Sequence, residues 1–193
     1  MRSQRKRILF ILGTTGVGKN TVIDKLQEKE PRLAVMTQCT TRVQRDGESG
    51  KLFIDNNEMD TLSISSDYCV ISTQYNDGVI RYALSYVEIR RILDSGRVPV
   101  IDWAVSRMQF IDPEISREVY SVYLLPPSLQ ELERRLKTSQ RDNMEERIEK
   151  ARREICRFRN GEFVGMYNES VINENVCRTV EEILLILYSK VCL

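Results

Sequence analysis

The 193-residue sequence contains no histidine. Without an imidazole, Ser-His-Asp and Cys-His nucleophile chemistry and His-ligated metal sites are excluded. The sequence has five cysteines, widely spaced and without a Cys-x-x-Cys pair. It therefore predicts neither a disulfide framework nor a zinc site, and it favours a reduced, cytoplasmic protein. Chemistry is expected from lysine, arginine, carboxylates, backbone amides and a metal with oxygen ligands.

Long apolar runs and an excess of one charge are also missing. The apolar stretch Ile8–Leu12 is much shorter than the ~20 residues of a membrane helix, so neither a membrane span nor a signal peptide is expected. Lys and Arg number 29 against 28 Asp and Glu. This balance argues against a protein that coats nucleic acid or acidic membranes. The length and the composition, 41% hydrophobic and 30% charged, predict one globular domain.

Short apolar runs alternate with amphipathic or charged segments along most of the chain. The expected strands are Arg7–Leu12, Leu33–Met36, Val98–Trp103, Val119–Leu125 and Val171–Ile172. The expected helices are Lys19–Lys29, Tyr86–Leu93, one opened by Pro126-Pro127-Ser128 and ending at Leu136, Asn143–Phe158 and Thr179–Val191. This alternation predicts an α/β fold with a parallel core sheet.

The alternation breaks between about Gln38 and Ser85. Two expected strands, Tyr68–Gln74 and Val79–Leu84, flank Asn76-Asp77-Gly78, which is a strong signal for a tight hairpin. This part of the chain therefore predicts an inserted antiparallel piece.

The sharpest motif is Gly13-Thr14-Thr15-Gly16-Val17-Gly18-Lys19, which fits G-x-x-x-x-G-K between a strand and a helix. Its glycines let backbone N–H groups curl around phosphate oxygens, and the helix that follows adds the positive end of its dipole. Lys19 brings a compact positive charge to the β- and γ-phosphates. The motif predicts that Gly13–Lys19 binds the phosphates of ATP.

The residue after the lysine departs from the motif, which prefers a hydroxyl that holds Mg²⁺. Asn20 stands there, and Thr21 follows. An Asn carbonyl oxygen is a suitable hard ligand, whereas Thr21 lies about 100° further around the helix. Asn20 is therefore the candidate Mg²⁺ ligand; the alternative is that it only caps the helix.

A second anion site is indicated by Thr40-Thr41-Arg42-Val43-Gln44-Arg45-Asp46-Gly47-Glu48. Two arginines three residues apart, preceded by hydroxyls, suit a phosphate held by bidentate guanidinium contacts. A phosphate loop combined with a second basic site predicts phosphoryl transfer between two phosphorylated molecules.

With these motifs, the chain resembles the guanylate kinase family of nucleoside monophosphate kinases. The resemblance rests on GTTGVGKNT, TTRVQRDGESGKLF, YLLPPSLQELERRL and ESVINEN, in that order, and it spans about residues 7 to 190. It implies a P-loop fold with a core (1–37, 86–137 and 160–193), an acceptor-binding region (38–85) and a helical lid (about 138–159). It also implies Mg²⁺-dependent transfer of the γ-phosphate of ATP to a nucleoside monophosphate. Among these acceptors, GMP is the one expected.

The resemblance assigns roles to the acceptor side. Arg42 and Arg45 would grip the acceptor phosphate, and Tyr82 would add a hydroxyl. Phe53 stands where the family usually has a tyrosine that also contacts this phosphate. Asp102 would hold Mg²⁺ through waters or orient the acceptor.

On the donor side, the resemblance makes Arg135 and Arg147 the lid arginines that close on the transferring phosphate. A further family arginine falls at Ser139, with Arg141 nearby as a substitute. Asn173 falls where the family contacts the adenine of ATP; the alternative is a helix cap.

The sequence departs from the family where guanine is read. The family has a glutamate in the inserted region, and its position falls here at Val70, Ile71 or Ser72. A second acid of the family falls at Ala104. Gln38 is left as the candidate that contacts a base through its amide.

Two alternatives stay open beside a GMP kinase. One is a kinase for another phosphorylated acceptor such as ribose 1,5-bisphosphate, because a sister family also has a non-hydroxyl residue after the lysine, lacks the base-reading Glu and resembles this chain at Ser106-Arg107. The other is a non-catalytic binding module. The expected partners are small nucleotides, for a monomer or a homodimer.

Overall fold

A computed structural model describes residues 6–44, 50–75, 78–138, 144–191 and 193. Five strands form its central sheet: β1 (Ile8–Leu12), β2 (Leu33–Val35), β7 (Val98–Asp102), β8 (Val119–Leu125) and β9 (Glu169–Ile172). They lie in the order β2-β7-β1-β8-β9, and every pair of neighbours is parallel. The predicted α/β fold with a parallel core sheet is confirmed.

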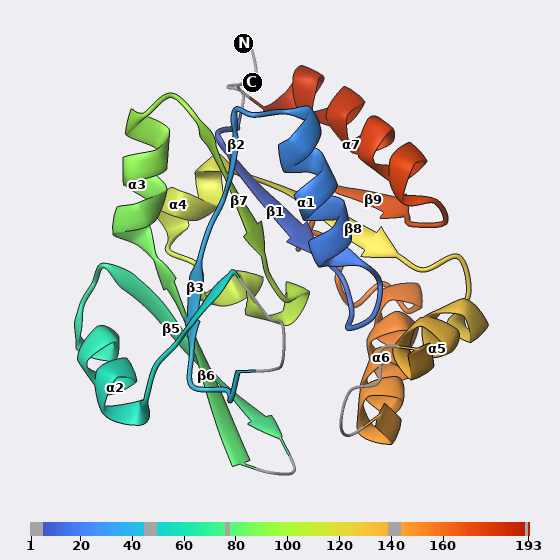
Figure 1. Cartoon of the computed structure of the whole chain (residues 1–193), viewed down its shortest axis with the longest axis horizontal. Coiled ribbons are helices and arrows are strands. Elements are labelled where there is room, and N and C mark those ends of the chain that lie inside the picture. Colours follow the sequence, from blue (N-terminus) through green and yellow to red (C-terminus); the bar gives the residue numbers. More distant parts are fainter. Residues whose placement is uncertain (1–5, 45–49, 76–77, 139–143, 192) are drawn as a thin grey trace.

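The side chains of β1 divide the core between the two faces of this sheet. Leu9 and Ile11 pack against the apolar sides of α1 (Lys19–Lys29) and α7 (Val176–Lys190), which lie together on one face (Figure 1). Ile8, Phe10 and Leu12 join the cluster of the other face, which includes residues of α3 (Tyr86–Asp94) and α4 (Pro113–Glu118). All five β1 side chains are fully buried, as expected of a parallel strand covered on both faces.

A smaller sheet holds β3 (Gln38–Thr40), β4 (Lys51–Phe53), β5 (Tyr68–Tyr75) and β6 (Gly78–Ser85), in the order β4-β3-β6-β5. β5 and β6 form the predicted hairpin, in a register that pairs Tyr75 with Gly78; Asn76 and Asp77 lie outside the described residues. The expectation of a wholly antiparallel piece is wrong, because β3 and β4 pair in parallel. These three-residue strands and α2 (Asn56–Ile64) carry too little periodicity to be predicted.

Two helices, α5 (Leu129–Thr138) and α6 (Met144–Arg159), pack on each other through Leu132, Leu136, Ala151 and Ile155. Figure 1 shows this pair and the smaller sheet on opposite sides of the end of β1. A 3₁₀ helix, η1 (Val105–Phe110), follows β7 on the side of the smaller sheet. Of the helices in the described ranges, none is long and apolar enough to cross a membrane.

Candidate functional site

The loop Gly13–Gly18 joins the end of β1 to the first turn of α1. Gly13 and Gly18 have φ angles of 134° and 97°, which only glycine adopts readily. A Cβ on Gly13 would lie 2.6 Å from the Leu124 carbonyl oxygen, and one on Gly18 would lie 2.7 Å from Asn173 Nδ2. The loop is therefore pressed against β8 and the segment after β9, so its backbone shape is fixed before any ligand binds.

Lys19 holds its ammonium group over this loop. Its Nζ donates to the carbonyl oxygens of Gly13 at 2.6 Å and Thr14 at 3.2 Å, and lies 3.7 Å from Asp102 Oδ1. Asp102 ends β7, the strand beside β1, so the parallel sheet brings these two groups to one edge. The pair combines a charge for phosphate oxygens with a carboxylate.

The loop also carries hydroxyl groups. Thr14 is buried, and its Oγ1 has no hydrogen-bond partner within the part of the chain that the structure describes. Thr15 Oγ1 accepts from Arg147 Nη2 of α6 at 2.9 Å. Arg147 of α6 thus contacts the loop. Asn20 and Thr21 lie exposed in the first turn of α1.

Arg135 lies against the same loop from α5. Its Nη2 donates to the Asn173 carbonyl at 3.0 Å and its Nη1 to the Val17 carbonyl at 3.5 Å. Glu131 anchors it by accepting from Arg135 Nε at 2.8 Å. Hydrogen bonds from Arg134 first, and then from Arg135, lower the pKa of Glu131 to about 2. The guanidinium is therefore held beside the loop by a carboxylate that stays ionised.

Asn173 does not lie as expected of an adenine contact. The residue is 1% exposed, and its Nδ2 donates to the Val17 carbonyl at 2.8 Å. Its Oδ1 accepts from Thr179 Oγ1 at 3.0 Å. Both ends of the amide are engaged inside the protein, so the side chain ties the loop to α7. The alternative of a helix cap fits no better, because Asn175 caps α7.

On the acceptor side, Arg42 follows β3 directly. Its guanidinium carbon lies 5.5 Å from the centroid of the Phe53 ring, and its Nη1 donates to the Val43 carbonyl at 2.8 Å. Phe53 lacks a hydroxyl, yet its ring supports the arginine by a cation–π contact. Arg45, like Ser139 and Arg141, lies outside the described residues.

Gln38 is not placed as a base-reading residue in this structure. It is 4% exposed, its Nε2 donates to the Asp102 carbonyl, and its Oε1 accepts from Lys51 Nζ at 3.5 Å. The amide therefore fastens the smaller sheet to the end of β7. Lys51 lies in the segment TTRVQRDGESGKLF, but the sequence analysis gave it no role.

Tyr82 also differs from the expectation that it offers a hydroxyl to the acceptor phosphate. It is 9% exposed, and the guanidinium carbon of Arg107 lies 3.9 Å from its ring centroid. Burial raises the pKa of Tyr82, and neighbouring Tyr75 raises it further. Arg107, which the sequence analysis named only for its likeness to the sister family, was left out of the candidate site; it lies in η1, five residues after the end of β7.

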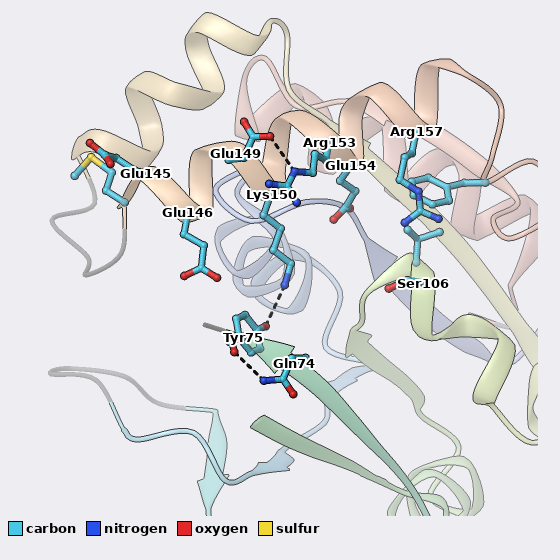
Figure 2. A pocket seen from close by; sticks show the side chains of 13 residues that line it. Gln74, Tyr75, Ser106, Glu145, Glu146, Glu149, Lys150, Arg153, Glu154 and Arg157 are labelled. Carbon is cyan, nitrogen blue, oxygen red and sulfur yellow. Dashed lines mark hydrogen bonds and ion pairs between the residues drawn. The ribbon is translucent and has the colours of Figure 1, made fainter. Parts of the chain in front are cut away.

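A cleft of about 1060 Å³ lies between the smaller sheet and α6. Figure 2 shows Glu146 and Lys150 of α6 extending into it, with Tyr75 of β5 on the opposite wall and Ser106 of η1 at one end. The residues that line the cleft are mostly polar or charged, and most of them belong to α6.

A family model for guanylate kinase matches residues 5–186. A guanylate kinase from Wolbachia sp. subsp. Brugia malayi is 30% identical over 97% of this chain and 95% of its own. One from Rhodopseudomonas palustris (strain BisB5) is 28% identical over 95% of this chain and 83% of its own.

Among solved structures, guanylate kinase from Anaplasma phagocytophilum matches with a TM-score of 0.71 and 20% identity, over 97% of this chain and 87% of that one. That likeness supports the fold. The phosphate loop, the converging arginines and the match over nearly the whole chain agree: the chain belongs to the guanylate kinase family of nucleoside monophosphate kinases.

Proposed function

We propose that this protein transfers the γ-phosphate of ATP to GMP. The observation that carries the proposal is the convergence on one loop of Lys19 and of arginines from two lid helices, Arg135 and Arg147. Charge spreads over the γ-phosphoryl oxygens during transfer, and guanidinium groups stabilise it where water is excluded. The names of the similar proteins supply the acceptor, GMP.

In this proposal ATP lies with its phosphates on Gly13–Lys19, and the acceptor phosphate is held by Arg42 and Arg45. The acceptor phosphate oxygen is already anionic, so the attack needs no general base of high pKa. This suits a chain without histidine. Closure of α5 and α6 brings Arg135 and Arg147 over the reacting phosphate.

Magnesium fits the site as an ion carried mainly by substrate phosphates. Within the described residues no group of three or more His, Cys, Asp or Glu is placed to hold a metal. Mg²⁺ in kinases commonly keeps waters and takes one or two carboxylates besides phosphate. Asp102, through water, and Asn20 would hold it here, and the ion would neutralise charge on the phosphates.

The test is a steady-state assay of ADP formation from Mg·ATP with GMP, dGMP, AMP, CMP, UMP and ribose 1,5-bisphosphate in parallel. Turnover led by GMP supports the proposal. Turnover led by the sugar bisphosphate or another nucleotide means that the acceptor has changed. Measurable ATP binding without turnover on any acceptor favours an unlisted acceptor or a binding module.

A further inference from the structure

Three polar side chains of α6, Arg147, Lys150 and Glu154, follow one another at i, i+3 and i+7. This spacing places them on one side of the helix. Arg147 Nη2 donates to Thr15 Oγ1 of the loop after β1 at 2.9 Å, and Glu154 Oε1 accepts from the Tyr123 hydroxyl of β8 at 2.9 Å. One side of α6 therefore contacts both that loop and the core sheet, and Lys150 lies between these two contacts.

Lys150 contacts the smaller sheet through a single residue, Tyr75 of β5. Its Nζ donates to the Tyr75 hydroxyl at 3.2 Å and lies 4.3 Å from the centroid of the ring. Figure 2 shows the Lys150 side chain reaching across the cleft to Tyr75, and both residues line the cleft. Because the tyrosine meets both the charge and the N–H donor, it holds the long lysine side chain in one direction.

The cations that neighbour Lys150 on α6 have different partners. Arg153 pairs with Glu149 and Arg157 with Glu162, so each of these charges is matched by a nearby carboxylate. Between the residues that the structure describes, no salt bridge joins Lys150 to a carboxylate. The contact of Lys150 with Tyr75 is therefore not part of the charge pairing along the helix surface.

Tyr75 belongs to the sheet that also positions Arg42. It ends β5, which pairs along its length with β6, and β6 pairs with β3. Arg42 lies two residues after the end of β3. The contact between Lys150 and Tyr75 thus joins the helix that carries Arg147 to the sheet that carries Arg42.

A different side of α6 packs on α5. Ala151 and Ile155 are buried in the apolar cluster between the two helices, and Arg152 Nη2 lies 2.7 Å from Glu133 Oε1 of α5. The two helices therefore form one packed pair. A contact at Lys150 positions this pair and not only a single side chain.

We propose that Lys150 is a positioning residue, whose contact with Tyr75 sets the place of α6 and so directs Arg147 to the loop Gly13–Gly18. Arg147 lies less than one helical turn from Lys150, so a displacement of the helix at Lys150 also displaces the Arg147 guanidinium. This inference rests on the proposed function, which gives Arg147 its role at the transferring phosphate. Its consequence is that phosphoryl transfer depends on a tyrosine of the smaller sheet.

The first test is Lys150→Met, which removes the ammonium group and keeps an unbranched side chain. We expect kcat for ADP formation from Mg·ATP and GMP to fall about 5- to 10-fold, with both KM values within about 2-fold, because Arg147 is misplaced while the phosphate sites remain. Lys150→Arg should restore most of kcat, since a guanidinium also donates and binds a ring face. Arg159→Met is the matched control, because Arg159 is an exposed cation in the last turn of the same helix.

Substitutions of Tyr75 test the other half of the contact. Tyr75→Phe keeps the ring and should lower kcat only about 2- to 3-fold, whereas Tyr75→Leu should act as strongly as Lys150→Met. The decisive variant combines Lys150→Met with Tyr75→Leu. It should be no slower than either single variant, because two residues that act through one contact are not additive. Thermal melts verify folding of each variant.

Hydrogen exchange of the chain without substrates tests the contact independently of turnover. Both Lys150→Met and Tyr75→Leu should raise the exchange rates of amides in α6 by about 5-fold, because the helix opens more often once the contact is lost. The amides of α7, which packs on the core sheet, should exchange as before.

Three results would overturn the inference while leaving kinase activity in place. One is a double variant whose loss of kcat is the product of the two single losses, and another is a raised KM at unchanged kcat in Lys150→Met. Either would mean that Lys150 acts on a ligand directly. The third is unchanged exchange in α6. ATP binding without ADP formation from any acceptor would instead overturn the proposed function, and the exchange rates would still decide whether the contact holds α6.

Discussion

The proposed donor and acceptor sites are built on different principles. The donor loop is shaped by its backbone, and buried contacts from α5 and from the segment after β9 fix it in place. The proposed acceptor side relies on side chains in or beside short elements, such as Arg42 just after β3 and Phe53 at the end of β4. If the proposed sites are right, recognition of the donor phosphates is fixed by the fold, whereas recognition of the acceptor can change by substitution.

The supports of the two sides differ in the same way. Asn173, buried and hydrogen-bonded at both ends of its amide, holds the donor loop. On the acceptor side, Gln38 fastens the sheet to β7 while Phe53 and Tyr82 offer ring faces to arginines. Substitutions on the donor side should therefore abolish activity, and substitutions on the acceptor side should redirect or weaken it.

The largest effect is expected from Lys19→Ala. Removing the charge from the transferring phosphate should lower kcat by about 10³-fold, with the melting temperature little changed. Steady-state ADP formation measures this. Lys25→Ala is the control, because Lys25 lies on the same helix in an exposed pair with Glu28. Normal turnover of the Lys19 variant would contradict the site assignment.

Arg42→Ala should change the kinetic constants for the acceptor and leave those for ATP unchanged. We expect kcat/KM for the acceptor to fall about 10- to 100-fold, with KM raised, because a charge-assisted phosphate contact is lost. The KM for ATP should stay constant, as it should in the control Arg90→Ala, which removes an exposed arginine of α3. If only the KM for ATP rises, the two phosphate sites have been assigned in reverse.

Asn173→Ala should remove the hydrogen bonds that hold the loop Gly13–Gly18 against α7. Leaving buried partners without their hydrogen bonds should lower the free energy of unfolding by about 1–3 kcal/mol, measured by chemical denaturation. The KM for ATP should rise, and the KM for GTP used as donor should rise equally. Thr179→Val removes one of these bonds and should have a smaller effect. If only the use of ATP is lost, and the free energy of unfolding stays the same, the result would instead support the hypothesis that Asn173 contacts the adenine of ATP.

The smallest effect tests the scaffold away from the cleft. Glu30 accepts from Arg32 Nη2 at 2.7 Å and from the Tyr188 hydroxyl at 3.2 Å. The hydrogen bond from Arg32 leads in lowering the pKa of Glu30 from 4.5 to about 2. Glu30→Gln should lower the free energy of unfolding at neutral pH by about 2 kcal/mol, with kcat unchanged.

The pH dependence of this effect follows from the sign of the shift. The pKa of Glu30 is lower in the folded chain, so its stabilisation is complete above about pH 4.5 and is lost as the pH falls toward 2. Denaturation curves of the two proteins should converge over that range. Two results would contradict this account. One is a difference in the free energy of unfolding that stays constant with pH. The other is a difference as small as that caused by the exposed control Glu28→Gln.

Much of the fold could be predicted because β1, β7 and β8 are apolar runs covered on both faces, and such runs mark parallel strands. The helices that cover them have clear apolar sides. β3, β4, η1 and α4 were not predicted, since elements of three to six residues hold at most two periods of their pattern and these lack the apolar run that marks β2. Their conformations depend on the surfaces on which they pack.

The sequence by itself determined the donor loop and its lysine, because the shape of Gly13–Lys19 follows from local backbone freedom between a strand and a helix. Only the tertiary structure decided which polar side chains face the cleft. Gln38, Tyr82 and Asn173 are buried by contacts with distant segments, whereas Lys150 is brought to Tyr75 across 75 residues of chain. Side-chain direction depends on packing between elements, which no local pattern specifies.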